Sequence, residues 1–212
     1  MPTALLFGAG GTLGTACHER LVKEGWDVLT ATHDKALNLE LPKLDAIVWA
    51  QGLNFSGSIE ETSLDNWNQI IDANVTFIFR TLQEILSRDL LQKNSRLVIL
   101  SSVWEQLARP NKIAYITSKS ALGGLVRALS VDLAPLGISI NSVMPGVIES
   151  QMTRQHLSAK TIESIRRETP GGELVTASEV AAVILYLISN DSAGITGQSV
   201  VIDNGWSIYK NV

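Results

Sequence analysis

The sequence predicts a three-layer α/β fold built around a doubly wound parallel sheet. Short apolar runs alternate with helical patterns along the whole chain, and a glycine-rich turn directly follows the first apolar run. Strands that alternate with helices are typical of βαβ units, and therefore of a parallel sheet covered on both faces. The sequence shows no internal repeat, low-complexity tract or linker. We therefore expect one domain spanning residues 1–212.

Apolar runs of four to six residues supply the expected strands, at residues 4–7, 28–32, 46–50, 97–100, 138–143 and 199–202. Between these runs, apolar residues recur at helical spacing. Ser63 can cap a helix that runs toward Asn74. A long helix begins near Lys112 and stops before Pro135, because proline cannot continue a helix. The last helix is expected over residues 180–187.

The sequence provides unusually few residues for one edge of the predicted sheet. Only thirteen residues separate Thr32, at the end of the second strand, from Ala46, at the start of the third. A parallel crossover needs about a dozen residues for each strand that it adds. Two complete crossovers do not fit, so we expect this edge to have lost two helices and to keep at most a stub of its outermost strand.

Composition narrows the class of protein. The chain has 212 residues, a net charge of −4 and no basic run, which argues against a nucleic-acid groove. Its single cysteine, Cys17, sits at an apolar helical position and is expected in the core. The N-terminus shows no charged leader, and the longest apolar stretch, residues 180–188, is too short for a membrane span. We expect a cytoplasmic protein with no nucleic-acid partner, no membrane partner and no metal.

Tyr115 and Lys119 carry the strongest chemical signal. They lie one turn apart on the long helix, where an ammonium favours the ionised form of a phenol and lowers its pKa. A phenol starts from a pKa of about 10 and needs a shift of about 3 units, roughly 4 kcal/mol, to work near neutral pH. Ser102, after the preceding strand, would hold a carbonyl oxygen beside the tyrosine. These residues predict proton transfer to and from an alcohol; the alternative is ordinary helix surface.

The glycine-rich turn between the first strand and the first helix predicts dinucleotide binding. Glycines there permit a tight turn, let a pyrophosphate approach the backbone and allow close packing of helix on strand. The helix N-terminus adds N–H donors and a positive dipole end for the phosphates. In isolation such a segment can be a plain turn, but its place in a βαβ unit favours the cofactor. The expected contacts are Gly8, Gly10, Gly11, Thr12, Leu13 and Gly14.

The choice between NAD and NADP depends on the end of the second strand. An acidic residue there would bind the ribose 2′-hydroxyl and repel a 2′-phosphate. This chain has Thr32 at that position, followed by His33, Asp34 and Lys35. The missing acid and the two basic neighbours favour NADP. A shift of one residue would place Asp34 on the ribose and favour NAD, so both cofactors stay open.

Together these residues resemble the single-domain short-chain dehydrogenase/reductase family over essentially the whole chain. Ser102, Tyr115 and Lys119 match the family's catalytic serine and Tyr-x-x-x-Lys pair. Asn74 matches the asparagine that holds a water in the proton relay. The resemblance implies a Rossmann-type fold, an NADP or NAD cofactor, and reduction of a small-molecule carbonyl to an alcohol or the reverse. It also implies a homodimer or homotetramer through the two long helices that end near Ser87 and Pro135.

The resemblance also extends the expected cofactor site. Residues 143–148 look like the segment that contacts the nicotinamide. Residues 37–39 look most like the NADPH-using β-ketoacyl-acyl carrier protein reductases, where they border the adenine. Residues 49–52 stand in place of the family's Asn-Asn-Ala-Gly, and Gly11 stands where many NADP-using members carry arginine. The further cofactor contacts are therefore Thr32, His33, Asn38, Leu39, Ala50, Gln51, Gly52, Tyr115, Lys119, Pro145, Gly146 and Ile148.

The substrate is expected over the carboxyl ends of the strands. Trp104, Arg109 and the segment 149–172, whose centre could close as a lid, are candidate walls. Basic residues of that segment could bind an anionic substrate, or form a solvated helix face; they are Arg154, His156, Arg166 and Arg167. Trp206 could serve a subunit contact. A cofactor-sensing or structural protein on the same fold remains the alternative to an enzyme, and an epimerase or dehydratase is a smaller one.

The cofactor prediction can be checked directly. Because the acidic residue is missing at the end of the second strand, we expect tighter binding of NADPH than of NADH. Titration of the protein with each reduced cofactor measures the two dissociation constants. A clear preference for NADH would contradict the NADP assignment.

Overall fold

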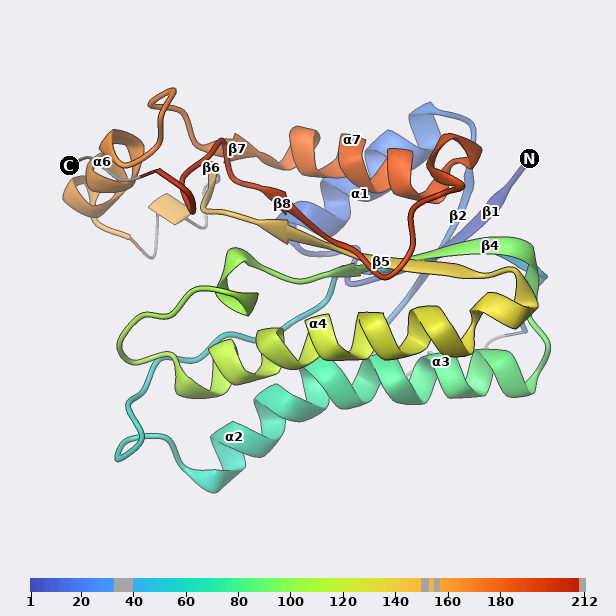
Figure 1. The fold of residues 1–212 in the computed structure, drawn as a ribbon, viewed down its shortest axis with the longest axis horizontal. Coiled ribbons are helices and arrows are strands. Elements are labelled where there is room, and N and C mark those ends of the chain that lie inside the picture. Colours follow the sequence, from blue (N-terminus) through green and yellow to red (C-terminus); the bar gives the residue numbers. More distant parts are fainter. Residues whose placement is uncertain (33–39, 150–152, 155–156, 210–212) are drawn as a thin grey trace.

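Six parallel strands form the central sheet of the computed structural model, which describes residues 1–32, 40–149, 153–154 and 157–209 (Figure 1). In spatial order they are β2 (Asp27–Ala31), β1 (Thr3–Phe7), β3 (Leu44–Trp49), β4 (Leu91–Leu100), β5 (Ser139–Pro145) and β8 (Ser199–Ile202). All five pairings are parallel. The chain steps outward from β1 to β2 and returns past β1 to β3, which makes β1/β3 the switch point of a doubly wound sheet. The six predicted strands are confirmed.

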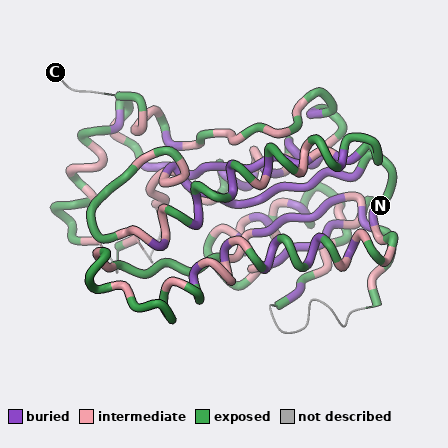
Figure 2. Tube along the Cα trace, turned by 60° about the horizontal axis from the view of Figure 1, so that its bottom comes forward, coloured by how far each residue is buried: buried purple, intermediate pink, exposed green. Residues whose placement is uncertain are grey.

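Helices cover both faces of the sheet (Figure 1). On one face lie α1 (Thr12–Lys23) and α7 (Ala177–Ile188), and on the other lie α2 (Leu64–Ile71), α3 (Phe77–Ser87) and α4 (Ile113–Asp132). Two apolar clusters fill the spaces between the layers, and Figure 2 shows the buried residues running along the strands between the helices. A strand that is buried on both faces appears in the sequence as a continuous apolar run, so these strands could be predicted from the sequence.

The described residues agree with a shortened edge of the sheet, but the expected stub of an outermost strand falls partly on residues 33–39, outside the described residues. β2 pairs with β1 alone, and residues 40–43, before β3, belong to no helix or strand. The predictions for His33, Asn38 and Leu39 fall outside the described residues. β2 therefore forms the edge of the described sheet.

Two glycines fix how β1 joins α1. Gly8 has a φ of 78°, in the region that favours glycine. A Cβ on Gly14 would lie 2.0 Å from the carbonyl oxygen of Gly8, so no side chain fits there. This contact presses the first turn of α1 against the end of β1. The helix N-terminus is thereby held at the carboxyl end of the sheet.

The helices on the α4 face have one feature that the sequence did not predict. Ser63 caps α2 as expected, and its Oγ accepts a hydrogen bond from the Asn66 amide at 3.1 Å. The chain does not simply continue as an α-helix, because a π-helix at Asp72–Thr76 joins α2 to α3. π-turns inside helices often occur at functional sites. This one turns Asn74 into the protein, where it is buried.

Cys17 is a buried residue of α1 and lies in the core, as predicted. Burial raises the pKa of its thiol to about 12, because a thiolate is costly in apolar surroundings. It is therefore a packing residue and not a nucleophile. Neither α4 nor any other described helix combines the length and apolar character needed to cross a membrane.

Candidate active site

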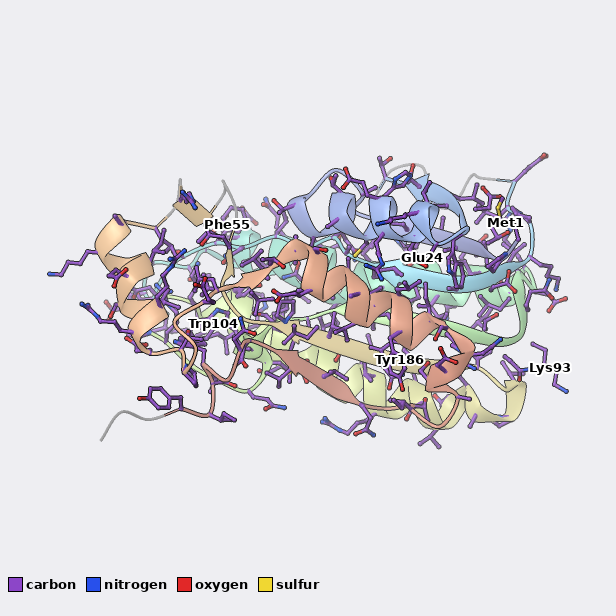
Figure 3. The ribbon with its side chains drawn as sticks, turned by 90° about the horizontal axis from the view of Figure 1, so that it is seen from above. Met1, Glu24, Phe55, Lys93, Trp104 and Tyr186 are labelled. Carbon is purple, nitrogen blue, oxygen red and sulfur yellow. The ribbon has the colours of Figure 1, made fainter. Side chains whose placement is uncertain are left out.

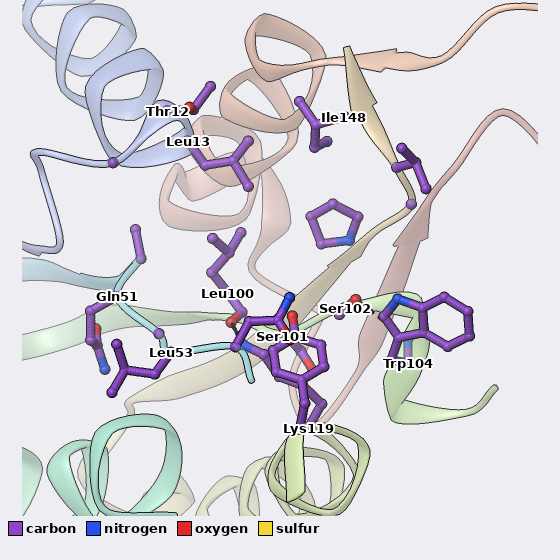
Figure 4. A pocket seen from close by; sticks show the side chains of 18 of the residues that line it. Thr12, Leu13, Gln51, Leu53, Leu100, Ser101, Ser102, Trp104, Lys119 and Ile148 are labelled. Carbon is purple, nitrogen blue, oxygen red and sulfur yellow. Dashed lines mark hydrogen bonds between the residues drawn. The ribbon is translucent and has the colours of Figure 1, made fainter. Parts of the chain in front are cut away.

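A pocket of about 360 Å³ opens at the carboxyl ends of the strands. It lies between the first turn of α1, the ends of β3, β4 and β5, and the start of α4 (Figure 4). Residues predicted for the site make up most of its wall: Gly11, Thr12, Leu13, Ala50, Gln51, Gly52, Ser102, Trp104, Tyr115, Lys119, Pro145, Gly146 and Ile148. Sequence motifs far apart in the chain thus meet in one cavity.

Ser102 and Tyr115 are brought together from two different elements. β4 ends at Leu100, and Ser102 begins the 3-10 turn Val103–Glu105, where its Oγ accepts a hydrogen bond from the Trp104 amide at 3.4 Å. Tyr115 lies in the first turn of α4. The Ser102 side chain lies close enough to the Tyr115 phenol to lower the pKa of that phenol. A carbonyl oxygen placed here would have a serine hydroxyl and a phenol as partners.

Lys119 lies one turn after Tyr115 and is buried. Its Nζ donates a hydrogen bond to the carbonyl oxygen of Leu100 at 2.9 Å and lies 5.7 Å from the centre of the Tyr115 ring. Burial lowers the pKa of Lys119 to about 8, and the negative charge of Glu105 acts in the opposite direction. Lys119 is therefore a lysine whose charge changes close to the physiological range.

The sequence predicts that Lys119 and a cationic cofactor ring together lower the pKa of Tyr115. The residues of the chain alone do not lower it, and the share of the cofactor stays a prediction. Burial raises the pKa of the phenol, and the Ser102 side chain opposes this only in part. The Lys119 ammonium donates its hydrogen bond to Leu100 and does not offset the effect of burial on the pKa of Tyr115. Because the sequence shows spacing and not desolvation, the motif alone could not reveal this.

Asn74 lies behind the pocket wall and not in it. Its Oδ1 accepts a hydrogen bond from the Leu53 amide at 2.7 Å, and its Nδ2 donates to the Leu53 carbonyl at 3.0 Å and to the Ser118 Oγ at 2.8 Å. A Cβ on Gly52 would lie 3.2 Å from the Asn74 Oδ1 and 3.7 Å from the Lys119 Nζ. Asn74 therefore anchors the segment after β3 beside the lysine. The water-holding role stays a prediction.

The first part of the pocket fits a dinucleotide cofactor. A Cβ on Gly10 would meet no atom within 4 Å, so internal packing does not require this glycine. Open space beside a helix N-terminus is what a pyrophosphate needs. Gln51 lines the same pocket, and both its amide atoms are buried without a hydrogen-bond partner among the described residues. Buried polar groups normally have partners, so Gln51 points to a polar ligand.

Other predicted cofactor residues do not line the pocket. Gly8, Gly10 and Gly14 shape the turn beneath it, and Thr32 is exposed at the end of β2. Four pocket residues were not predicted, namely Leu53, Asn54, Leu100 and Ser101. All four are next to a predicted residue or one position further, so their neighbours were the available signal. Val147 and Thr153 belong to the predicted segments 143–148 and 149–172, although neither was singled out there.

The opposite side of the pocket is lined by Trp104. Its ring packs edge-on against Trp206, with 5.8 Å between the ring centres, and Arg109 lies 5.7 Å from the Trp104 ring centre. The Trp206 Nε1 donates to the Glu168 Oε2 at 3.3 Å. Trp206 therefore has a contact within its own chain, against the pocket wall. Figure 3 places Trp104 and Phe55 at the end of the molecule opposite Met1 and Lys93.

Two arginines of the predicted lid share one carboxylate as their ion-pair partner. Arg154 and Arg166 both pair with Glu149, at 2.7 Å and 2.8 Å. These two bonds lower the pKa of Glu149. The segment contains a helix, α6 (Ala159–Arg167), with no buried residue. Arg167 is exposed, and His156 lies outside the described residues. Anion binding by Arg154 and Arg166 is therefore disfavoured.

Comparisons with known proteins match most of the chain. The sequence profile of the family described as "Enoyl-(Acyl carrier protein) reductase" matches residues 30–207. The chain is 31% identical over 169 residues to the cyclopentanol dehydrogenase of Comamonas testosteroni, covering 79% of this chain and 68% of that one. It is 28% identical over 188 residues to dehydrogenase/reductase SDR family member 6 of Aquarana catesbeiana, covering 86% and 77%.

The fold has close counterparts among solved structures. The aldohexose dehydrogenase of Thermoplasma acidophilum superposes with a TM-score of 0.90 and 25% identity, covering 100% of this chain and 96% of that one. The relatives are named dehydrogenases and reductases, which supports an oxidoreductase. With the family profile spanning most of the sequence, the chain belongs to the short-chain dehydrogenase/reductase family.

Proposed function

We propose that this protein is an NAD(P)-dependent oxidoreductase that reduces a carbonyl to an alcohol, or carries out the reverse reaction, with NADP the favoured cofactor. The observation that carries the proposal is the meeting of Ser102, Tyr115 and Lys119 in one pocket with the first turn of α1. A proton-transfer set beside a phosphate-binding helix end suits hydride chemistry on an oxygen-bearing carbon. The related cyclopentanol dehydrogenase supports the same class of reaction.

Each side chain has a distinct part in the proposed reduction. The cofactor, when bound, supplies the hydride. Ser102 donates a hydrogen bond to the carbonyl oxygen, and Tyr115 gives its proton to that oxygen as negative charge develops there. The Lys119 ammonium stabilises the phenolate that remains. Asn74 holds the segment after β3 that packs beside Lys119.

The first test removes only the phenolic oxygen, with Tyr115→Phe. Loss of a general acid costs about 10²–10⁴-fold in turnover, so we expect a loss of at least this size, with unchanged affinity for the reduced cofactor. Absorbance of the reduced cofactor over a panel of carbonyl compounds gives the rate, and quenching of tryptophan fluorescence gives the affinity.

Tyr186→Phe is the matched control, because Tyr186 is an exposed tyrosine of α7. It is expected to turn over at the wild-type rate. Full activity of Tyr115→Phe would overturn the assignment. Cofactor binding without turnover in the wild-type protein would favour the cofactor-sensing alternative.

Two basic side chains at the mouth of the pocket indicate the kind of substrate. Lys112 lies 6.0 Å from the centre of the Tyr115 ring and donates to the Asn54 Oδ1 at 2.8 Å. Burial, and then the charge of Arg109, lowers the pKa of Lys112. Neither cation has an ion-pair partner among the described residues. We propose that the substrate carries an anionic group that binds near Arg109 and Lys112.

Arg109→Gln tests this substrate class. We expect KM to rise about tenfold to a hundredfold for a keto acid, since a charged contact is worth roughly 1.5–3 kcal/mol, and to stay unchanged for the corresponding neutral amide. Steady-state rates with the matched pair give both constants. Arg88→Gln, on the surface of α3, is the control. Equal effects on acid and amide would exclude an anion contact at Arg109.

We further propose a homodimer or homotetramer through the α3/α4 face. Leu64, Phe79 and Val131 are more than half exposed on α2, α3 and α4 (72%, 51% and 72%). Phe79→Asp is expected to lower the mass in solution, because a buried charge without a partner opposes association. Val22→Asp, on the opposite face, should leave the mass unchanged (Figure 1). A wild-type mass equal to that of one chain contradicts the proposal.

A further inference from the structure

Glu105 is a carboxylate behind the pocket that the proposed reaction does not yet use. Its Oε2 accepts a hydrogen bond from the Ser101 Oγ at 2.7 Å, and its Oε1 accepts one from the Ser199 Oγ at 2.8 Å. The Ser142 Oγ in turn donates to the Ser199 Oγ at 2.9 Å. One side chain therefore ties the end of β4, which leads into Ser102, to β5 and β8.

The α4 helix has a recess that accommodates this carboxylate. A Cβ on Gly123 would lie 2.4 Å from the Glu105 Oε1, so only glycine leaves room for the oxygen in this position. The carbonyl oxygen of Glu105 accepts a hydrogen bond from the Ser120 Oγ at 2.9 Å. Both contacts fall within one turn after Lys119 on the same helix. Glu105 is thus fixed against α4 at the level of the lysine.

The surroundings of Lys119 contain few other charges. Leu100 of β4 offers a carbonyl, and the segment after β3 offers Gly52 and the amide of Asn74. On α4, the titratable neighbour is the Tyr115 phenol, whose far side faces Lys112. The guanidinium of Arg127 lies on the Gly123 side of Glu105, 3.4 Å from the position of a Cβ on Gly123.

We propose that Glu105 is a positioning residue of this site, which fixes the strand end that carries Ser102 and keeps Lys119 protonated. The effect of Glu105 on turnover rests on the function proposed above. Three hydroxyl groups hold the Glu105 side chain and backbone in place. The negative charge stands at the back of α4, and the ammonium faces the pocket. An acid in this place offsets part of the cost of burying the ammonium.

The sign of the effect follows from the two opposing influences on Lys119. Burial brings its pKa down to about 8, and Glu105 works against that fall. Removal of the Glu105 charge therefore lowers the pKa of Lys119 further. A larger share of Lys119 is then neutral between pH 7 and 8. A neutral lysine no longer stabilises the Tyr115 phenolate, so turnover in the reduction direction declines at a lower pH than in the wild type.

Glu105→Gln isolates the charge. An amide has nearly the same shape and can still bond with Ser101 and Ser199, because a serine hydroxyl both donates and accepts. NMR of protein labelled with ¹³C at the lysine ε-carbons follows the ionisation of Lys119, whose signal is identified with Lys119→Met. We expect the titration midpoint of Lys119 to fall by about half a unit or more. Glu84→Gln, at a partly exposed position of α3, is the control and leaves the midpoint unchanged.

Further variants separate the effect of the Glu105 charge from the effect of its hydrogen bonds. Ser199→Ala removes one hydrogen bond and keeps the charge, so it should leave the midpoint nearly unchanged. Gly123→Ala displaces the Glu105 carboxylate without removing it, so the titration midpoint of Lys119 should again fall. This variant replaces Glu105→Gln if Glu105→Gln does not fold. An unchanged midpoint in Glu105→Gln, or in Gly123→Ala where that variant stands in, overturns the proposal.

Turnover provides the second measurement. The alkaline limb of the pH–rate profile should move to lower pH in Glu105→Gln by the same amount as the NMR midpoint. If the NMR midpoint of Lys119 shifts but the alkaline limb of the pH–rate profile does not, Lys119 ionisation does not limit the reaction. That result overturns the proposed effect of Glu105 on turnover. If the wild-type protein turns over no carbonyl, the proposed function fails, and the NMR midpoint still decides whether Glu105 holds the charge of Lys119.

Discussion

The site depends on burying one ammonium group. An unpaired charge in a protein interior is unfavourable, and burial shifts a lysine toward its neutral form. Lys119 is buried almost completely, yet its Nζ donates to the strand-end carbonyl of Leu100, and the negative charge of Glu105 acts against the effect of burial on its pKa. Leu100 ends β4, and Glu105 belongs to the turn that follows it. In the proposal made above, the position of this strand end is therefore linked to the charge of the lysine.

A second constraint acts at the other side of the pocket. The contact between Gly8 and Gly14 leaves no space for a side chain and holds the first turn of α1 at the end of β1. That end adjoins the switch point of the sheet, where a doubly wound fold has its natural crevice. The pocket end proposed for phosphate binding and the end proposed for proton transfer are thus built from neighbouring strands. Their separation is set by the spacing of the sheet.

Two further features lie on the half of the pocket proposed for the cofactor. Among the described residues, β2 forms the edge of the sheet, and residues 40–43 lead directly back to β3. The strand-end segment after β3 carries Gln51, whose amide has no partner among the described residues. The other half of the pocket brings Ser102, Tyr115 and Lys119 together.

Apolar periodicity and motif spacing are local properties, so the sequence by itself predicted the strands, most of the helices, and Ser102, Tyr115 and Lys119 as residues that the structure brings into one pocket. It could not determine the raised pKa of Tyr115, the contact of Trp206 with Trp104 or the place of Glu105 against Gly123. These depend on burial and on contacts between residues distant in the chain. Such quantities exist only once the layers pack, so the tertiary structure alone decided them.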